Sequence, residues 1–286
     1  MATTDPRTVL ITGCSSGIGY AAAHRLKARG YRVFATARRT ADVARLCEEG
    51  LESVQLDLTD AASIHAAVGQ ILERTGGTLY GLFTNAGYGQ PGAVEDLSRA
   101  VLRDQFETNV FGTHELNTRL IPVMRRQGFG RIIQNSSVLG LIALPYRGAY
   151  NASKFALEGL YDTLRLELAN TGIHVCLVEP GPIESRFRAN SYAVYQRTIE
   201  AANSFHRDRY ESLIARLNKE GAAAPFTLPA EAVVKKVIHA LESPRPRIRY
   251  YVTFPTYLFA TLKRVLPWRT LDRVLSGVGR GERRRK

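Results

Sequence analysis

The sequence has little cysteine, and its histidines are scattered. Its 286 residues include three cysteines, Cys14, Cys47 and Cys176, and six histidines. An odd number of cysteines without metal-ligand spacing indicates neither a disulfide framework nor a zinc site. We therefore expect reduced thiols and no structural metal.

Long hydrophobic runs are also missing. No apolar stretch approaches the roughly 18 residues of a membrane-spanning helix, and residues 1–7 lack the hydrophobic segment of a signal peptide. We therefore expect a cytoplasmic protein. The length and the 45% of apolar residues fit one large α/β domain with a full core.

Negative charge is scarce near the C-terminus. Residues 245–286 contain twelve Arg or Lys and two acidic residues, so this segment carries +10 of the net charge of +13. Any preference for acidic partners is therefore a property of this segment.

Short β-branched or apolar runs alternate with longer segments of helical periodicity. This pattern predicts a parallel sheet covered by helices on both faces. The predicted strands are residues 8–11, 32–36, 53–56, 81–84, 131–135, 174–178 and 249–253. The predicted helices are residues 18–29, 40–49, 60–75, 99–127 and 150–171.

Seven strands joined by right-handed crossovers predict a single α/β domain, a doubly wound, seven-stranded parallel sheet of the Rossmann type, over residues 1–254. Residues 184–228 interrupt the short strand-to-helix rhythm, which indicates a lid inserted over the site. Residues 255–286 form a basic, amphipathic C-terminal extension that we expect to be helical and then disordered at its end.

A glycine-rich turn, Thr12-Gly-Cys-Ser-Ser-Gly-Ile-Gly19, follows the first strand and opens the first helix. Such a turn lets the backbone approach a pyrophosphate, and the helix N-terminus supplies N–H donors. Tight turns need glycine for conformational reasons too, but this position favours a dinucleotide site. The candidate cofactor-binding residues here are Gly13, Ser15, Ser16, Gly17, Ile18 and Gly19.

No acidic residue stands at the end of the second strand, where sites that prefer NAD usually have one. The chain reads Phe34-Ala-Thr-Ala-Arg38-Arg39 instead. Arg38 is therefore a candidate ligand for a 2′-phosphate, with Ser15 as a second donor, and we predict NADP(H) as the cofactor. The alternative is that Arg38 is an ordinary solvated arginine.

Polar and small residues end the next strands. Asp57, followed by Leu58, can accept a hydrogen bond from an adenine amino group, or it can cap a turn. Asn85, Ala86 and Gly87 are small enough for the backbone to pass a ribose, and they also form an acceptable loop. After the sixth strand, Pro180 and Gly181 shape a stiff turn whose Ile183 N–H and Ser185 hydroxyl can bind the nicotinamide amide.

Tyr150 and Lys154 share one face of a predicted helix, with Ser137 at the end of the fifth strand. A phenol has a pKa near 10, and lowering it by about three units takes roughly 4 kcal/mol. Lys154 and an oxidised nicotinamide are positive charges that can supply this. In the reductive direction Tyr150 donates a proton to a carbonyl oxygen, which Ser137 also binds.

Asn109 lies within a predicted helix, where asparagine is mildly unfavourable. It can hold a water beside Lys154, or it can be a satisfied structural asparagine. Both interpretations remain open.

In these motifs the chain resembles the short-chain dehydrogenase/reductase family over residues 7–254. The resemblance implies Tyr150 as catalytic acid/base, Lys154 binding the nicotinamide ribose, Ser137 orienting the substrate and Asn109 supporting a proton relay. It also implies a homodimer or homotetramer built through the helices at residues 99–127 and 150–171. Ser185 departs from the threonine of many members but keeps the hydroxyl.

The glycine-rich turn and Ala-Thr-Ala-Arg38 are similar to the NADP-using hydroxysteroid and retinol dehydrogenase branch. The segment from Val138 to Tyr146 is largely apolar, and the lid contributes aromatic residues, which indicates a pocket for a lipophilic carbonyl compound or alcohol. These lid residues are Phe187, Tyr192, Tyr195, Phe205 and Phe226. They can equally pack the lid or a dimer surface.

In the extension, apolar residues from Tyr257 to Leu275 recur at helical spacing among basic residues, with Trp268 nearby. Such helices can lie in an anionic membrane interface, here at the inner face of a membrane, or they can cover the pocket. Nucleic-acid binding is disfavoured, because the chain has no recognition module. A catalytically silent NADP(H) sensor is a further alternative, although it would be expected to lack Ser137, Tyr150 or Lys154.

Overall fold

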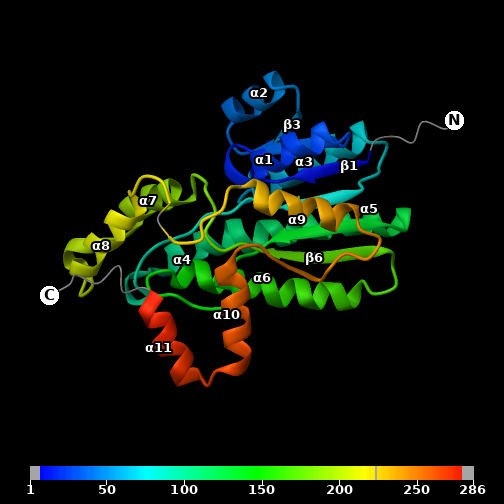
Figure 1. The fold of residues 1–286 in the computed structure, drawn as a ribbon. Helices are drawn as coiled ribbons and strands as arrows, with labels where there is room; N and C mark the ends of the chain where they lie inside the picture. The colour runs from blue at the N-terminus through cyan, green and yellow to red at the C-terminus, as the bar shows by residue number, and fades with distance from the viewer. Residues whose placement is uncertain (1–6, 223, 279–286) are drawn as a thin grey trace.

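Seven parallel strands form one sheet in the computed structural model, which describes residues 7–222 and 224–278, with strand order β3-β2-β1-β4-β5-β6-β7 (Figure 1). From β1 the strand order proceeds first to one side, through β2 and β3, and then to the other, through β4 to β7. The sheet is therefore doubly wound, and the predicted fold class is confirmed. The strands are β1 Thr8–Ile11, β2 Arg32–Ala37, β3 Glu52–Gln55, β4 Gly81–Thr84, β5 Gly130–Asn135, β6 Ile173–Glu179 and β7 Arg249–Tyr251.

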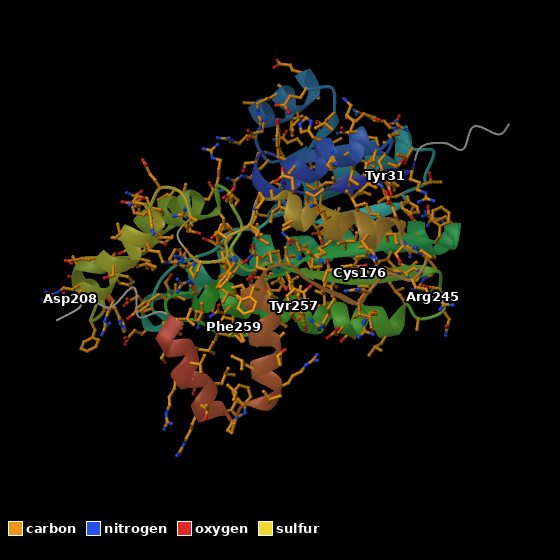
Figure 2. The ribbon with its side chains drawn as sticks, in the orientation of Figure 1. Tyr31, Cys176, Asp208, Arg245, Tyr257 and Phe259 are labelled. Atoms are coloured by element: carbon orange, nitrogen blue, oxygen red, sulfur yellow. The ribbon has the colours of Figure 1, made fainter. Side chains whose placement is uncertain are left out.

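Helices cover both faces of the sheet, because consecutive strand residues point to opposite sides. Val9 and Ile11 of β1 belong to a core with α1, α2 and α9, whereas Leu10 belongs to a core with α3, α5 and α6. The helices are α1 Gly17–Ala28, α2 Thr40–Glu48, α3 Ala61–Arg74, α5 Gly112–Gln127, α6 Gly148–Glu167 and α9 Glu231–Glu242. Cys14 and Cys176 are buried in the first core, and Figure 2 places Cys176 within the sheet.

The long helix predicted at residues 99–127 is not uniform. It consists of α4 Arg99–Phe106, a π-helical turn at Glu107–Phe111, and α5. A π turn inserts one extra residue into the helix and occurs frequently at functional sites. Asn109 lies in this turn, which explains how a residue unfavourable in a regular helix is accommodated here.

The predicted lid contains α7 Phe187–Thr198 and α8 Arg207–Leu217, with a short 3₁₀ turn between them. A bridge between Ile183 and Leu228 joins the two ends of this region. Its helices have a small core of their own around Tyr195, Tyr210 and Leu213. Figures 1 and 2 show α7 and α8 beyond one end of the sheet, with Asp208 at the outer end.

The C-terminal extension forms two helices, α10 Phe254–Val265 and α11 Trp268–Val278, separated at Pro267. Phe259 of α10 and Leu271 and Leu275 of α11 are buried together with Ile142, next to Val138 and Leu139 (Figure 2 marks Phe259). The extension therefore covers the loop that follows Ser137. The predicted disorder at residues 284–286 lies outside the described residues.

Within residues 7–222 and 224–278, no helix combines the length and apolar character that spanning a membrane requires.

Candidate functional site

A cavity of about 1990 Å³ lies at the carboxyl ends of the strands. Its walls include Thr12 after β1, Asn85 after β4 and Pro180 after β6, as well as residues of the lid and of α10. Ligands of doubly wound sheets bind at this edge, beside the point where the strand order reverses. All predicted site residues line this cavity except Gly19 and Asn109.

The glycine-rich turn is held by the loop after β4. The Thr12 hydroxyl accepts hydrogen bonds from the backbone N–H groups of Asn85 and Ala86, both at 2.9 Å. A Cβ at Gly13 would lie 2.8 Å from the Ala86 Cα, and one at Gly19 would lie 2.3 Å from the Gly13 carbonyl oxygen. Both glycines are therefore required by close backbone approach, which also explains why Gly19 does not face the cavity.

Helix α1 begins at Gly17, and its N-cap residue Ser16 makes no capping hydrogen bond with its side chain. The first N–H groups of a helix have no partners within the helix. Ser15, Ser16, Gly17 and Ile18 line the cavity here. This end of α1 thus fits the pyrophosphate of a dinucleotide.

Two arginines follow β2, and the structure distinguishes them. Arg39 forms an ion pair with Asp42 at 2.7 Å, and Arg45 approaches the same carboxylate at 3.6 Å. Among the described residues, the exposed Arg38 guanidinium makes neither a hydrogen bond nor an ion pair, and it lines the cavity together with Ser15. Arg38 therefore carries a positive charge that no acidic side chain within residues 7–222 and 224–278 neutralises.

Asp57 and Asn85 have structural contacts of their own. Asp57 Oδ1 accepts from the Thr59 N–H at 2.9 Å and from its hydroxyl at 2.8 Å, as in a turn cap. Asn85 Nδ2 donates to the Thr12 carbonyl at 3.0 Å, and its Oδ1 accepts from Asn135 at 2.9 Å. Both side chains hold loops in place, while Leu58, Ala86 and Gly87 present small or apolar surface to the cavity.

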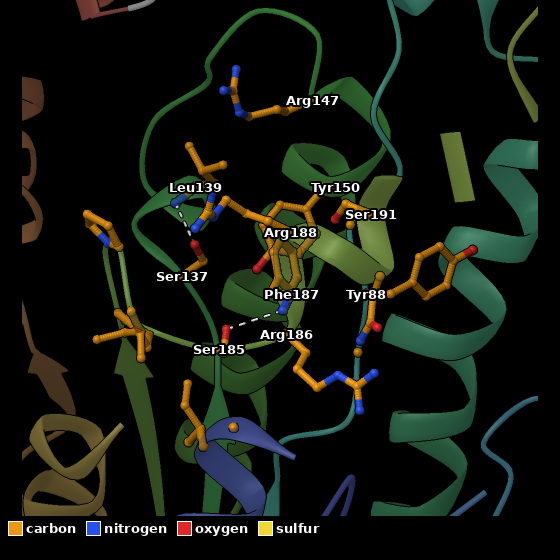
Figure 3. A pocket seen from close by; sticks show the side chains of 18 of the residues that line it. Tyr88, Ser137, Leu139, Arg147, Tyr150, Ser185, Arg186, Phe187, Arg188 and Ser191 are labelled. Carbon is orange, nitrogen blue, oxygen red and sulfur yellow. Dashed lines mark hydrogen bonds between the residues drawn. The ribbon is translucent and has the colours of Figure 1, made fainter. Parts of the chain in front are cut away.

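The turn after β6 connects the sheet to the lid. The Pro180 carbonyl accepts from the Val138 N–H at 2.8 Å, and a Cβ at Gly181 would lie 2.1 Å from the Thr253 hydroxyl. The bridge to Leu228 uses the Pro182 carbonyl and the Glu184 N–H, so it does not occupy the Ile183 N–H. The Ser185 hydroxyl accepts from the Phe187 N–H at 3.4 Å (Figure 3).

Tyr150, in the first turn of α6, faces Phe187 of the lid, with ring centroids 5.3 Å apart (Figure 3). Burial raises the pKa of Tyr150 to about 12, and the Ser137 hydroxyl lowers it in part. The lowered pKa that we expect requires both Lys154 and an oxidised nicotinamide beside the phenol. The Lys154 Nζ lies 5.6 Å from the Tyr150 ring centroid.

Lys154 is buried, with 5% of its surface exposed, and its Nζ donates to the Asn135 carbonyl at 2.8 Å. Burial lowers the pKa of Lys154 to about 8, and the Glu158 carboxylate opposes this shift. The amine therefore remains protonated at neutral pH. Ser137 follows β5 and precedes the 3₁₀ turn at Val138–Gly140, and its Oγ accepts from the Leu139 N–H at 3.1 Å (Figure 3).

Asn109 is buried behind the cavity wall. Its amide binds the Tyr88 N–H at 3.1 Å, the Tyr88 carbonyl at 3.0 Å and the Ser153 hydroxyl at 3.1 Å. These contacts favour the interpretation of a satisfied structural asparagine for the side chain. A role in a proton relay stays a prediction.

The apolar wall differs in part from the prediction. Phe187 and Phe226 line the cavity with Val138, Leu139, Ile142 and Leu144, but Tyr192, Tyr195 and Phe205 do not. Tyr195 packs in the core of the lid, where Tyr146 and Tyr192 also pack, and Phe205 is 92% exposed. The periodicity of α7 and α8 is compatible with either side facing the site, so sequence alone does not separate these roles.

Several residues that line the cavity were not predicted from the sequence. Tyr88 directly follows Asn85-Ala-Gly87, and burial raises its pKa to about 12. Phe254, Leu258 and Phe259 enter from the extension, and their apolar spacing was the available signal. Arg188 lines the lid side, where its guanidinium binds carbonyls at the end of α8, including that of Lys219 at 2.5 Å.

Comparison with known proteins gives a consistent result. The family model for short chain dehydrogenases matches residues 7–195. An uncharacterised oxidoreductase, YbbO, of Escherichia coli is 45% identical over 95% of this chain and 94% of its own. Human 17-beta-hydroxysteroid dehydrogenase type 1 is 35% identical over 86% of this chain and 77% of its own. Human retinol dehydrogenase 8 is 34% identical over 91% and 86%.

Solved structures agree with the fold. A short-chain dehydrogenase/reductase from Burkholderia phymatum in complex with NAD has a TM-score of 0.75 and 26% identity, covering 93% of this chain and 94% of its own. An actinorhodin polyketide ketoreductase with NADPH has a TM-score of 0.72 and 28% identity, covering 88% and 97%. Both forms of the cofactor therefore occur among the structural neighbours.

Proposed function

Because this chain belongs to the short-chain dehydrogenase family of oxidoreductases, we propose that it uses NADP(H) to transfer hydride between nicotinamide and the carbonyl or alcohol carbon of a lipophilic substrate. The observation that carries this proposal is the single cavity that joins Ser137, Tyr150 and Lys154 to the glycine-rich turn and Arg38. Homologues with hydroxysteroid and retinol dehydrogenase names favour the same class of substrate.

The proton chemistry follows from the protonated state of both groups. The nicotinamide supplies or accepts the hydride when it is bound. In the reductive direction Tyr150, whose phenol burial keeps protonated, donates its proton to the carbonyl oxygen. Ser137 donates a hydrogen bond to the same oxygen, and the Lys154 ammonium stabilises the phenolate that forms.

Arg38 favours NADP(H) over NAD(H). A 2′-phosphate would neutralise the one arginine after β2 that has no acidic partner among the described residues, whereas Asp42 is already paired with Arg39. The proposed role of Ser15 as a second donor to this phosphate rests on the fact that Ser15 and Arg38 line the same cavity.

The substrate end of the cavity favours a bulky apolar compound. Side chains from the loop after Ser137, from the lid and from the extension converge there. They include Leu139, Ile142, Phe187, Phe226, Leu258 and Phe259. Burying this surface against a lipophilic ligand provides binding energy at roughly 25 cal/mol per Å².

The experiment that tests the function is a panel of lipophilic aldehydes, retinoids and ketosteroids, assayed with NADPH and with NADH. We expect turnover with at least one class and kcat/KM at least tenfold higher with NADPH. Comparable kcat/KM with both cofactors would contradict the NADP(H) assignment. Tight NADPH binding without turnover of any compound would favour the alternative of a silent NADP(H)-sensing protein.

We also propose a peripheral contact of the extension with an anionic membrane, at the cytoplasmic face. Leu271 and Leu275 are used in packing, but Val265 is 66% and Trp268 72% exposed, next to Arg264 and Arg269. Exposed apolar side chains among basic residues fit the interface of such a bilayer. Replacing Val265 and Trp268 by serine should abolish co-sedimentation with anionic vesicles; unchanged co-sedimentation would remove this role.

An assembly of two or four copies is the remaining proposal. Leu102, Phe111 and Phe155 are apolar and at least 40% exposed on α4, the π turn and α6. These are the helices that the family resemblance assigns to the interface. Sedimentation velocity should show a dimer or tetramer, and replacing Phe111 by glutamate should dissociate it; a monomeric parent protein would contradict the proposal.

A further inference from the structure

A buried cluster of charged side chains lies next to the catalytic residues, and none of its members is among the predicted site residues. Glu158 lies one helical turn after Lys154 on α6 and is 7% exposed. Glu179, the last residue of β6, is fully buried, and Arg249 begins β7. Burying the two carboxyl groups is costly unless they are paired, so their contacts with the partly exposed Arg249 define what the cluster does.

Arg249 joins three elements through its guanidinium. Its Nη1 donates to both Glu158 and Glu179, and its Nη2 donates to Asp162 Oδ2 at 2.5 Å. Since Glu158 and Asp162 belong to α6, Arg249 fastens the catalytic helix to the adjoining strands β6 and β7. It also fixes the orientation of the Glu158 carboxylate.

The second oxygen of Glu158 supports the loop that carries Ser137. Its Oε1 accepts a hydrogen bond from the hydroxyl of Ser136, the neighbour of Ser137. Gly140, three residues further on, lies against the same group, because a Cβ there would be 3.0 Å from Glu158 Oε1 and 2.8 Å from Ser136 Oγ. The loop between Ser136 and Gly140 therefore rests on the Glu158 carboxylate.

Glu158 stands four residues after Lys154 on α6, a spacing that places both side chains on one face of the helix, where the carboxylate charge acts on the ammonium. Burial lowers the pKa of Lys154 to about 8, and Glu158 is the group that raises it again. Burial and the Glu158 carboxylate raise the pKa of Glu179, which favours its neutral form. Arg249 on β7 and Lys263 on α10 are the cations nearby, and both are themselves affected by Glu158.

We propose that Glu158 is a positioning residue that holds the Ser137 loop through Ser136 and supplies the counter-charge of the Lys154 ammonium, with Arg249 fixing its carboxylate. The proposal deepens the proposed function, because Lys154 and Ser137 act there on cofactor and substrate. It predicts that the charge and the hydrogen bond of Glu158 have separable effects.

The charge is tested with Glu158→Gln, which keeps the size of the side chain and an acceptor for Ser136. In lysine-labelled protein, with the Lys154 signal assigned from Lys154→Arg, the NMR titration midpoint of Lys154 should fall by about one pH unit. Because NADPH binding uses the protonated Lys154, the dissociation constant of NADPH, followed by fluorescence, should begin to rise at a lower pH in Glu158→Gln than in the parent protein. Asp162→Asn, which loses a carboxylate on the same Arg249, should leave the Lys154 midpoint unchanged.

The hydrogen bond is tested with Ser136→Ala, which removes one hydroxyl from the protein. We expect kcat to fall about tenfold because Ser137 is displaced, with the KM for NADPH within about twofold and an unchanged pH profile. In Ser136→Ala without substrate, we also expect faster hydrogen exchange of the backbone amides at residues 137–140. Glu158→Asp, which keeps the charge but shortens the side chain, should lower kcat as Ser136→Ala does and leave the Lys154 midpoint in place.

An unchanged Lys154 midpoint in Glu158→Gln overturns the role of the charge, and normal kcat and loop exchange in Ser136→Ala overturn the role of the hydrogen bond. The titration and the exchange are measured on the protein without substrate. A failure of the proposed enzymatic function, seen as absent turnover with every compound, is therefore distinguishable from a failure of this proposal.

Discussion

The two ends of the cavity are built differently. At the cofactor end, backbone approaches backbone: Gly13 lies against Ala86, Gly19 against the Gly13 carbonyl, and Thr12 binds two N–H groups of the next loop. At the substrate end, side chains from the lid and the extension meet, and the lid has its own small core. Close backbone approach restricts the residue types at the first end, whereas side chains of loops and helices line the second.

The largest expected effect is at the chemical centre between these two ends. Tyr150→Phe removes the proton donor and should lower kcat by about 10³-fold, while the dissociation constant of NADPH stays within about twofold. Turnover is followed by the absorbance of NADPH. Tyr88→Phe is the matched control, since Tyr88 lines the same cavity without a role in proton transfer. A Tyr150→Phe variant with near-normal turnover would refute the mechanism.

At the cofactor end, Arg38→Ala should raise the KM for NADPH about 10- to 100-fold, because a charge-assisted hydrogen bond to phosphate is lost. The KM for NADH should stay within about twofold. Arg39→Ala provides the comparison, since Arg39 is paired with Asp42. Equal effects of the two substitutions on NADPH would mean that Arg38 has no special role.

At the substrate end, Leu258→Ala should lower kcat/KM about tenfold for long or polycyclic carbonyl compounds and leave short aldehydes nearly unaffected. Comparing kcat/KM for the two substrate classes in one variant distinguishes a loss of pocket contacts from a general loss of activity. Phe205→Ala, at a side chain that is 92% exposed, should change neither. Equal losses for short and long substrates would contradict an apolar substrate pocket.

The pH dependence is the smallest effect and belongs to the cofactor end. The pKa of Lys154 is lowered to about 8, and the active form is the protonated one. The kcat/KM of carbonyl reduction should therefore be level up to about pH 7.5 and fall as the pH rises through 8. Because the ordinary pKa of lysine is higher, the unfolded chain binds more protons between the two values, and the contribution of Lys154 to stability rises with pH there.

The sequence predicted the sheet well because strand length, alternation with helices and turn residues are local signals. All seven strands were placed to within two residues, since β-branched runs such as Thr8–Ile11 end at glycine or asparagine turns. The π turn at Asn109 was not predicted, and the hydrogen bonds of Asn109 in this turn are made with Tyr88 and Ser153, which are distant in sequence. Helix α9 was not predicted from the sequence.

The orientation of side chains was predicted less well where either face of a helix could point toward the cavity. Tyr195 and Phe187 both stand on α7, yet one packs in the lid core and the other faces Tyr150. The cluster of Glu158, Glu179 and Arg249 was missed for a related reason. Each is an ordinary charged residue in sequence, and only the fold shows that they meet beneath the Ser137 loop.

The dependence on Arg249 has a consequence for how the protein matures during synthesis. The glycine-rich turn, the catalytic helix and the Ser137 loop all leave the ribosome before β7 does. Arg249 can donate its hydrogen bond to Glu158 only after β7 has been translated. The same holds for the packing of Thr253 against Gly181. A nascent chain therefore carries the side chains proposed to be catalytic before their site is assembled, and premature termination before residue 249 should yield a protein without a competent site.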